Sequence, residues 1–187
     1  GSRKKEISTL LPLFLDAAEN IQKESSEKLI FLLPLASTLE EKDLWQNGLK
    51  KGGTGLDIRI IRDDRYDVMA ACEVVIAASG TVTLELALLD VPMVVSYKFS
   101  PLTYQLGRML VKLKYFSLVN LIAGEEVVPE LLQDEVRPEN IARNILEILH
   151  NPERSERMRK GLLDVREQLG KKGASDRAAQ LALNMLC

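Results

Sequence analysis

The chain alternates between stretches of helical and strand-like hydrophobic periodicity. A helix is predicted over about residues 5–24, because apolar residues recur every three or four positions from Ile7 to Ala18. Thr38 is predicted to cap a second helix. The predicted strands are 29–35, 57–61, 74–78 and 92–99, with 115–118 as a last short one. The predicted helices after the first are 38–50, 65–72, 82–89, 101–112, 138–149, 152–169 and 174–186.

Strands that alternate with helices are typical of βαβ units, in which helices cover both faces of a parallel sheet. The sequence therefore predicts an α/β fold, a doubly wound Rossmann-like parallel sheet with extra C-terminal helices. Residues 1–187 are interpreted as a single domain whose C-terminal part, about 138–187, is helical. Ligands of such folds bind beyond the C-terminal ends of the strands. The loops after Ile61, Ala78 and Phe99 are therefore the expected site.

Composition removes several classes of function. The 27 acidic and 25 basic side chains give a formal net charge of -2, so the basic footprint of a nucleic-acid-binding protein is missing. Cys72 and Cys187 make no disulfide framework, and the single histidine, His150, is predicted to lie near a helix end. Neither a zinc site of His and Cys nor a Ser-His-Asp hydrolase is expected. No apolar run approaches the roughly 20 residues of a transmembrane helix.

The clearest chemical signal lies where the predicted strand 74–78 passes into a helix. Ser79, Gly80 and Thr81 form a turn of small residues, and a helix N-terminus offers unpaired N–H groups to a phosphate. Glu85 follows one helical turn later, where its carboxylate can accept hydrogen bonds from ribose hydroxyls. The alternative is an ordinary capped helix in which Glu85 only interacts with the helix dipole. The chain has no Asp-x-Asp motif, so no metal is expected on a diphosphate.

Several segments carry a resemblance to one family. They are A-S-G-T-V-T-L-E (78–85), V-P-M-V-V (91–95), S-P-L-T-Y (100–104) and Y-F-S-L-V-N-L-I-A-G-E-E-V-V-P-E-L-L-Q (115–133). Together they resemble the donor domain of lipid-A-disaccharide synthases, in which the last segment reads close to Y-V-S-L-P-N-L-L-A-G-R-E-V-V-P-E-L-L-Q. The beginning, G-S-R-K-K-E-I, is similar to the P-G-S-R-x-x-E-I loop of the family, although a Gly-Ser pair is also typical of a cloning scar.

The chain departs from the family pattern at two positions. Val119 stands where proline is usual, and Glu125 stands where arginine is usual. The second change reverses a charge near the expected site. The contact that arginine would make with a phosphate or with the acyl-sugar is therefore in doubt. Arg108 or Lys112 can supply the positive charge in its place.

The resemblance implies one half of a two-domain GT-B glycosyltransferase with its catalytic cleft between the halves. It implies an inverting hexosyl transfer in lipid A biosynthesis, in which UDP-2,3-diacylglucosamine is joined to 2,3-diacylglucosamine 1-phosphate through a β-1,6 bond. This chain matches the C-terminal half, which holds UDP. The catalytic base belongs to the missing N-terminal half, so no catalytic residue, metal or cofactor is assigned here. The residues expected to bind UDP are Ser2, Arg3, Ser79, Gly80, Thr81, Glu85, Asn120 and Gln133.

Two other interpretations stay open: a GT-B transferase or epimerase domain that uses UDP-N-acetylglucosamine, and a nucleotide-binding module without catalysis. The block from Asn120 to Gln133 argues against the first. The implied partners are the UDP-linked diacylglucosamine donor, the N-terminal acceptor domain and a second copy in a homodimer, whereas nucleic acid is not expected.

The expected location is the cytoplasm, with peripheral contact at the inner membrane of a Gram-negative-type bacterium. Residues 102–118 mix apolar and basic side chains, and are interpreted either as an amphipathic helix at a membrane surface or as a helix packed on the core. The chain begins without methionine or a signal-peptide pattern, so it is interpreted as a fragment, a processed product or a piece made for expression.

Overall fold

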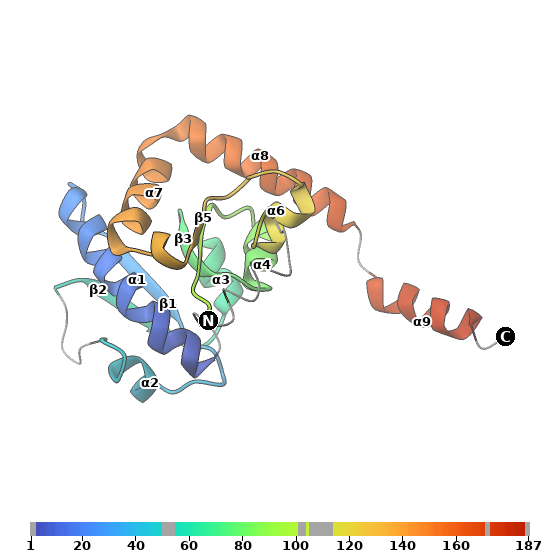
Figure 1. Cartoon of the computed structure of the whole chain (residues 1–187), viewed down its shortest axis with the longest axis horizontal. Coiled ribbons are helices and arrows are strands. Elements are labelled where there is room, and N and C mark those ends of the chain that lie inside the picture. The colour runs from blue at the N-terminus through green and yellow to red at the C-terminus, as the bar shows by residue number, and fades with distance from the viewer. Residues whose placement is uncertain (1–2, 50–54, 101–103, 105–113, 171–172, 186–187) are drawn as a thin grey trace.

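Figure 1 shows the computed structural model of the chain as layers of helices around short strands, with one C-terminal helix standing away from them. The structure describes residues 3–49, 55–100, 104, 114–170 and 173–185. The strands are β1 (Ile30–Pro34), β2 (Asp57–Ile61), β3 (Val75–Ala78), β4 (Met93–Tyr97) and β5 (Glu130–Leu132). The helices are α1 (Lys4–Glu24), α2 (Glu41–Trp45), α3 (Arg65–Ala70), α4 (Val82–Leu88), α6 (Leu118–Ala123), α7 (Pro138–His150), α8 (Pro152–Leu169) and α9 (Ala174–Asn184), with a 3-10 turn at Gln133–Glu135.

The strand pairs of the described residues are all parallel. β1 pairs with β2 in a two-stranded sheet, and β3, β4 and β5 form a three-stranded sheet in that order. Val95 of the central strand lies between Ala77 of β3 and Glu130 of β5. Parallel neighbours require a crossover segment between them, which the intervening helices provide. The predicted α/β class with parallel strands is confirmed.

The core lies around β4. Met93, Val94 and Val95 are at most 2% exposed, as expected for a strand covered on both faces. Figure 1 shows α1 and α7 on one side of the three-stranded sheet and α4 and α6 on the other. On this second side, α8 packs against α4 and α6 and buries Leu162 completely. The sheet is therefore held from both faces, and its strand ends are free to carry loops.

The predicted strand at 115–118 is wrong. The backbone N–H groups of Phe116 and Ser117 donate to the carboxylate of Glu130, so a side chain takes the place of a strand neighbour. α6 begins at Leu118, and the fifth strand is β5. The sequence pattern missed this because a short apolar run shows burial but not which partner its backbone finds.

The prediction for the second helix is wrong in its beginning and its length. α2 covers only Glu41–Trp45, and its N-cap is Glu40, not Thr38. The backbone N–H of Glu40 donates to Asp43 Oδ2 at 3.0 Å, which fixes the start of the helix there. The predicted helix at 101–112 lies outside the described residues, apart from Tyr104, which is helical.

α9 contributes no buried residue. Leu181 and Leu183 on it are 66% and 58% exposed, and Met185, which follows it, is 88% exposed. Figure 1 shows this helix apart from the layers formed by the other elements. The grouping of 1–187 into a single domain therefore stays a prediction. Within the described part of the chain, no helix combines the length and the apolar character needed to cross a membrane.

Candidate functional site

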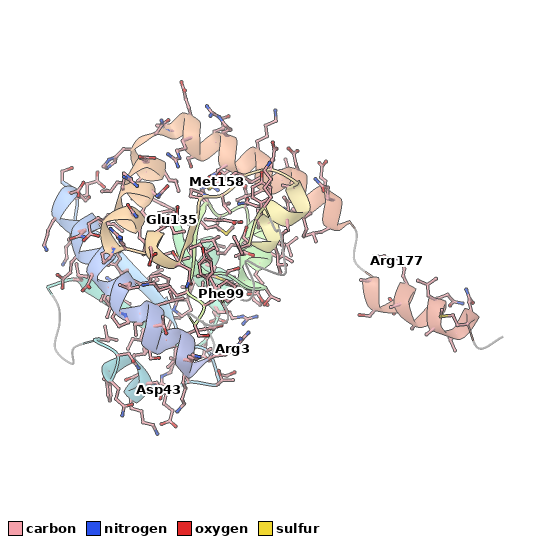
Figure 2. The ribbon with its side chains drawn as sticks, viewed as in Figure 1. Arg3, Asp43, Phe99, Glu135, Met158 and Arg177 are labelled. Carbon is pink, nitrogen blue, oxygen red and sulfur yellow. The ribbon has the colours of Figure 1, made fainter. Side chains whose placement is uncertain are left out.

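The C-terminal ends of the strands form the edge at which the expected ligand site lies. The Nζ of Lys4 lies 3.0 Å from Oδ1 of Asp43, which joins the beginning of α1 to α2, the helix that follows the C-terminal end of β1. Arg3, the N-cap of α1, therefore lies at this same edge. Figure 2 shows Arg3 and Asp43 toward one end of the molecule, away from Met158, with Phe99 between them and Met158.

The turn after β3 is fixed on its inner side and open on its outer side. Ser79 donates its backbone N–H to Ser96 O at 3.1 Å and its hydroxyl to Phe116 O at 3.0 Å. Gly80 and Thr81 are exposed. The tertiary contacts of Ser79 thus hold the turn in place while the next two residues face solvent.

Gly80 has no steric reason to be glycine in the folded chain. Its φ lies outside the left-handed region, and a Cβ built on it meets no heavy atom within 4 Å. Any small residue fits the backbone conformation at this point. A glycine that the fold does not require is typical of a place where something else approaches the backbone closely.

Glu85 is half-buried and paired across the edge. Its Oε1 lies 3.2 Å from Nη2 of Arg65, which begins α3 in the loop after β2. The same Nη2 donates to the hydroxyl of Tyr66 at 2.6 Å, and the guanidinium carbon lies 4.6 Å from the centre of the Tyr66 ring. The hydrogen bond to Tyr66 and the charge of Glu85 raise the pKa of Arg65. Arg65 was not predicted, because β2 and β3 belong to different sheets and the sequence does not show that their loops meet.

Asn120 is completely buried, and the fold uses both ends of its amide. Nδ2 donates to Val128 O and to Glu130 Oε1, both at 2.8 Å. Oδ1 accepts from the backbone N–H groups of Val127 and Val128 at 2.9 and 3.0 Å. Two donors and two acceptor positions are the full capacity of an asparagine amide. The expected contact of Asn120 with UDP stays a prediction, and in this conformation its influence on a ligand runs through the segments it holds.

Glu130 joins this buried network to the turn after β3. Its carboxylate accepts from Phe116 N at 2.7 Å and from Ser117 N at 2.8 Å. Phe116 O in turn accepts the Ser79 hydroxyl, and Ser117 Oγ accepts from Asn120 N at the start of α6. The block from 115 to 133, which carries the family resemblance, is therefore connected to the turn after β3 by hydrogen bonds between side chains and backbone groups.

Gln133 braces the loop after β4. Its Oε1 accepts from Phe99 N at 2.6 Å, and its Nε2 lies 3.4 Å from Phe99 O. The Phe99 ring packs edge-on against Tyr97 and Phe116, with ring centres 4.4 and 6.5 Å apart. Like Asn120, Gln133 is engaged within the protein, and its expected contact with UDP stays a prediction.

The remaining predicted positions are less constrained. The side chain of Arg3 is 76% exposed and lies 3.6 Å from Glu6 Oε1, whereas Ser2 lies outside the described residues. Glu125 is exposed just beyond α6. The pKa of Lys114 is raised, first by its interaction with Tyr115 and to a smaller extent by the charge of Glu125. Arg108 and Lys112 lie outside the described residues.

A profile described as lipid-A-disaccharide synthetase matches residues 1–185. The chain belongs to this family. The lipid-A-disaccharide synthases of Nitrosococcus oceani and Geobacter sulfurreducens are 48% and 44% identical to it over 186 residues, and that of Trichlorobacter lovleyi is 47% identical over 188. These alignments cover 100% of the chain and 47% or 48% of each relative. The chain therefore spans about half the length of the curated relatives it matches.

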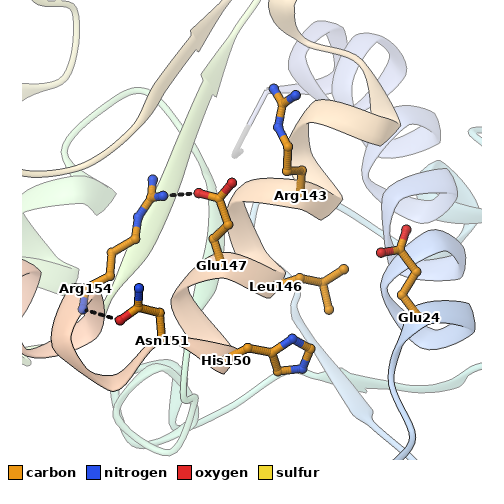
Figure 3. Close-up of a pocket in the computed structure, with 7 residues that line it drawn as sticks. All are labelled: Glu24, Arg143, Leu146, Glu147, His150, Asn151 and Arg154. Carbon is orange, nitrogen blue, oxygen red and sulfur yellow. Dashed lines mark hydrogen bonds and ion pairs between the residues drawn. The ribbon is translucent and has the colours of Figure 1, made fainter.

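In this member of the lipid-A-disaccharide synthase family, two surface cavities lie away from the strand edge. One has a volume of about 450 Å³. Figure 3 shows that it lies between the end of α1 and the junction of α7 and α8, where Arg154 pairs with Glu147. The second, of about 580 Å³, lies along α8. Neither is lined by Ser79, Thr81 or Glu85. Neither of these two cavities therefore coincides with the candidate site at the strand edge.

Proposed function

We propose that this chain is the donor-binding half of a lipid-A-disaccharide synthase and that it holds the UDP of a UDP-linked diacylglucosamine at the C-terminal edge of β3. The proposal rests on one observation above the others. Gly80 is exposed in the turn after β3, and the fold itself does not require a glycine there. Membership of the lipid-A-disaccharide synthetase family supports it.

The residues of the edge fit the parts of UDP. The turn formed by Gly80 and Thr81 offers backbone N–H groups that a phosphate can approach closely. Glu85, half-buried beside this turn, offers a carboxylate to ribose hydroxyls. Arg3 supplies an exposed guanidinium at the same edge. A cation and fixed N–H groups stabilise the negative charge that UDP gains as it leaves the sugar.

The proposed whole reaction needs a second half. The full enzyme would join the donor to 2,3-diacylglucosamine 1-phosphate with inversion, as a hexosyltransferase of lipid A biosynthesis. The acceptor site and the catalytic base would come from the N-terminal half, in keeping with relatives about twice as long as this chain. The proposed location is the cytoplasm, with peripheral contact at the inner membrane, where acylated substrates reside.

Calorimetric titration of the chain with UDP and with ADP tests the proposal. We expect UDP to bind, ADP to bind more weakly, and the chain alone to transfer no sugar. Equal affinity for the two nucleotides, or no binding of either, contradicts the proposal.

A substitution locates the site. Removing a charged hydrogen-bond acceptor costs about 1.5–3 kcal/mol, so Glu85→Ala is expected to weaken UDP binding about 10- to 150-fold. The matched control is Glu156→Ala, which removes an exposed carboxylate from α8. Thermal melting of both variants shows whether the chain stays folded. If Glu85→Ala leaves the UDP affinity unchanged, Glu85 does not bind UDP and only interacts with the dipole of its own helix.

A further inference from the structure

The ion pair between Arg65 and Glu85 joins two loops that follow strands of different sheets. Asp64, the residue before α3, has φ 53° and ψ 37°, a left-handed conformation that aspartate tolerates better than most residues. This turn starts α3 at Arg65 and brings its side chain within 3.2 Å of Glu85 Oε1. The contact spans 20 positions of sequence, so it exists only because the loops meet at the strand edge.

The guanidinium of Arg65 is held on two sides. Its Nη2 reaches both Glu85 and the hydroxyl of Tyr66, and its carbon lies 4.6 Å from the centre of the Tyr66 ring. An arginine fixed by an aromatic ring and a hydroxyl loses less freedom when it holds a carboxylate than an unsupported one. This supported guanidinium contacts Oε1 of Glu85, although the side chain of Arg65 is itself 55% exposed.

We propose that Arg65 is a positioning residue of the donor site: it occupies Oε1 of Glu85 and leaves Oε2 to accept hydrogen bonds from the two hydroxyls of a ribose. The inference rests on the proposed function, because it takes Glu85 to face the nucleoside. A carboxylate offers about four acceptor positions on two oxygens, so one oxygen stays available after the pair has formed.

The role predicts selectivity for a sugar with both hydroxyls. A carboxylate oxygen fixed in place gains from two hydroxyl donors and loses one of these bonds when the 2′-hydroxyl is missing. A carboxylate free to rotate adapts to either ligand and discriminates less. The ratio of the affinities for UDP and 2′-deoxy-UDP therefore reports on the orientation of Glu85, which a change in overall stability does not alter.

The experiment is a double-mutant cycle read by titration. UDP and 2′-deoxy-UDP are titrated into the unchanged chain, Arg65→Ala, Glu85→Ala and the double variant. We expect Arg65→Ala to lower the affinity for UDP by about tenfold, within the usual range for coupled neighbours, and to reduce the UDP to 2′-deoxy-UDP ratio. In the Glu85→Ala background, the loss of Arg65 is expected to have no further effect on either ligand.

Two further variants sharpen the result. Arg65→Lys keeps the charge and is expected to recover part of the affinity for UDP. Arg62→Ala is the matched control, because Arg62 lies in the same loop, is similarly exposed at 62%, and pairs with Glu41 at 2.6 Å. It is expected to leave the affinity ratio unchanged.

The outcomes separate this inference from the function on which it rests. If the unchanged chain binds neither ligand, the donor site itself is contradicted and Arg65 loses its role with it. Suppose instead that the unchanged chain binds UDP more tightly than 2′-deoxy-UDP. If Arg65→Ala then weakens the binding of both ligands by the same factor, only the positioning role is overturned. The same holds if its effect on affinity adds fully to that of Glu85→Ala. Arg65 then acts on the diphosphate directly or on stability, which the melting temperatures of the variants show.

Discussion

The side-chain amide of Asn120 donates to the carboxylate of Glu130 across 2.8 Å, and this bond joins α6 to β5. Both residues belong to the block from 115 to 133, which carries the family resemblance. Glu130 also holds the backbone of Phe116, whose carbonyl accepts from Ser79. The block is therefore placed to influence the turn after β3 through the backbone, whether or not its side chains touch a ligand.

We predict that Asn120→Ala is strongly destabilising. The substitution leaves the N–H groups of Val127 and Val128 and the carbonyl of Val128 without this partner. Val128 is completely buried, whereas Val127 is half-buried. Each unpaired buried group costs about 1–3 kcal/mol, and two of these groups belong to buried Val128, so the free energy of unfolding should fall by at least about 2 kcal/mol. Urea unfolding measures it.

Asn140→Ala is the control, because this asparagine lies near the surface at the beginning of α7. Its loss should stay within about 1 kcal/mol. We also expect Asn120→Ala to weaken UDP binding in the fraction that folds. A loss in stability no larger than that of Asn140→Ala contradicts the structural role.

We predict that Gly80→Ala separates binding from folding. A methyl group at this position meets no atom, and alanine restricts the unfolded chain, so stability should be unchanged or higher by up to about 1 kcal/mol. The same methyl group occupies the space through which a phosphate would reach the backbone, so UDP affinity should fall at least about tenfold. Melting and titration of one preparation give both values.

Gly161→Ala in α8 is the contrasting control for this pair of measurements. Its Cβ would lie 2.7 Å from a methyl carbon of Val127, so the chain must shift and stability should fall by about 1–3 kcal/mol. If Gly80→Ala binds UDP as tightly as the unchanged chain, the phosphate does not approach the backbone at this position, and the main argument for the proposed site is contradicted.

We predict an acid-sensitive contribution from Asp43. The hydrogen bond from the backbone of Glu40 and the contact with Lys4 hold the pKa of Asp43 below its ordinary value. A carboxyl with a lowered folded-state pKa stabilises the fold above its unfolded pKa, about 3.9, and this contribution is lost as the pH falls through the lower folded value.

Asp43→Asn tests this through melting temperatures measured between pH 7 and pH 3. The variant should be less stable than the unchanged chain at pH 7, and the difference should shrink below about pH 4. Asp16→Asn on the exposed face of α1 is the control and should show a smaller difference at pH 7. A difference that does not change with pH argues against ionised Asp43 as its source.

We predict that Glu125→Arg restores the usual family residue and leaves UDP binding equal or tighter. The substitution replaces an exposed negative charge with a positive one within the block from 115 to 133. Attraction to a diphosphate over a distance is screened by salt, so any gain should shrink as ionic strength rises. Titration at two salt concentrations measures it. Weaker binding at every salt concentration indicates that Glu125 makes a specific contact in this chain.

The sequence by itself determined the class of fold and most of the longer helices. α1, α7 and α8 begin and end within one residue of their predicted limits, because their apolar residues recur at the helical period over three or more turns. The strand β2 was predicted at its observed bounds from its β-branched residues. The turn after β3 was predicted from its small residues. The resemblance to the family was recognised from short continuous motifs, which can be read without knowing the fold.

Only the tertiary structure decided which groups meet at the strand edge. The run at 115–118 has strand-like composition, yet its backbone pairs with the Glu130 side chain, and Arg65 reaches Glu85 across a boundary between two sheets. Hydrophobic periodicity shows which positions of a single helix or strand face the core, and this is a local property of the sequence. The partner of a backbone N–H or of a charged side chain depends on where distant strands place their loops, and that is set by the packing of the whole core.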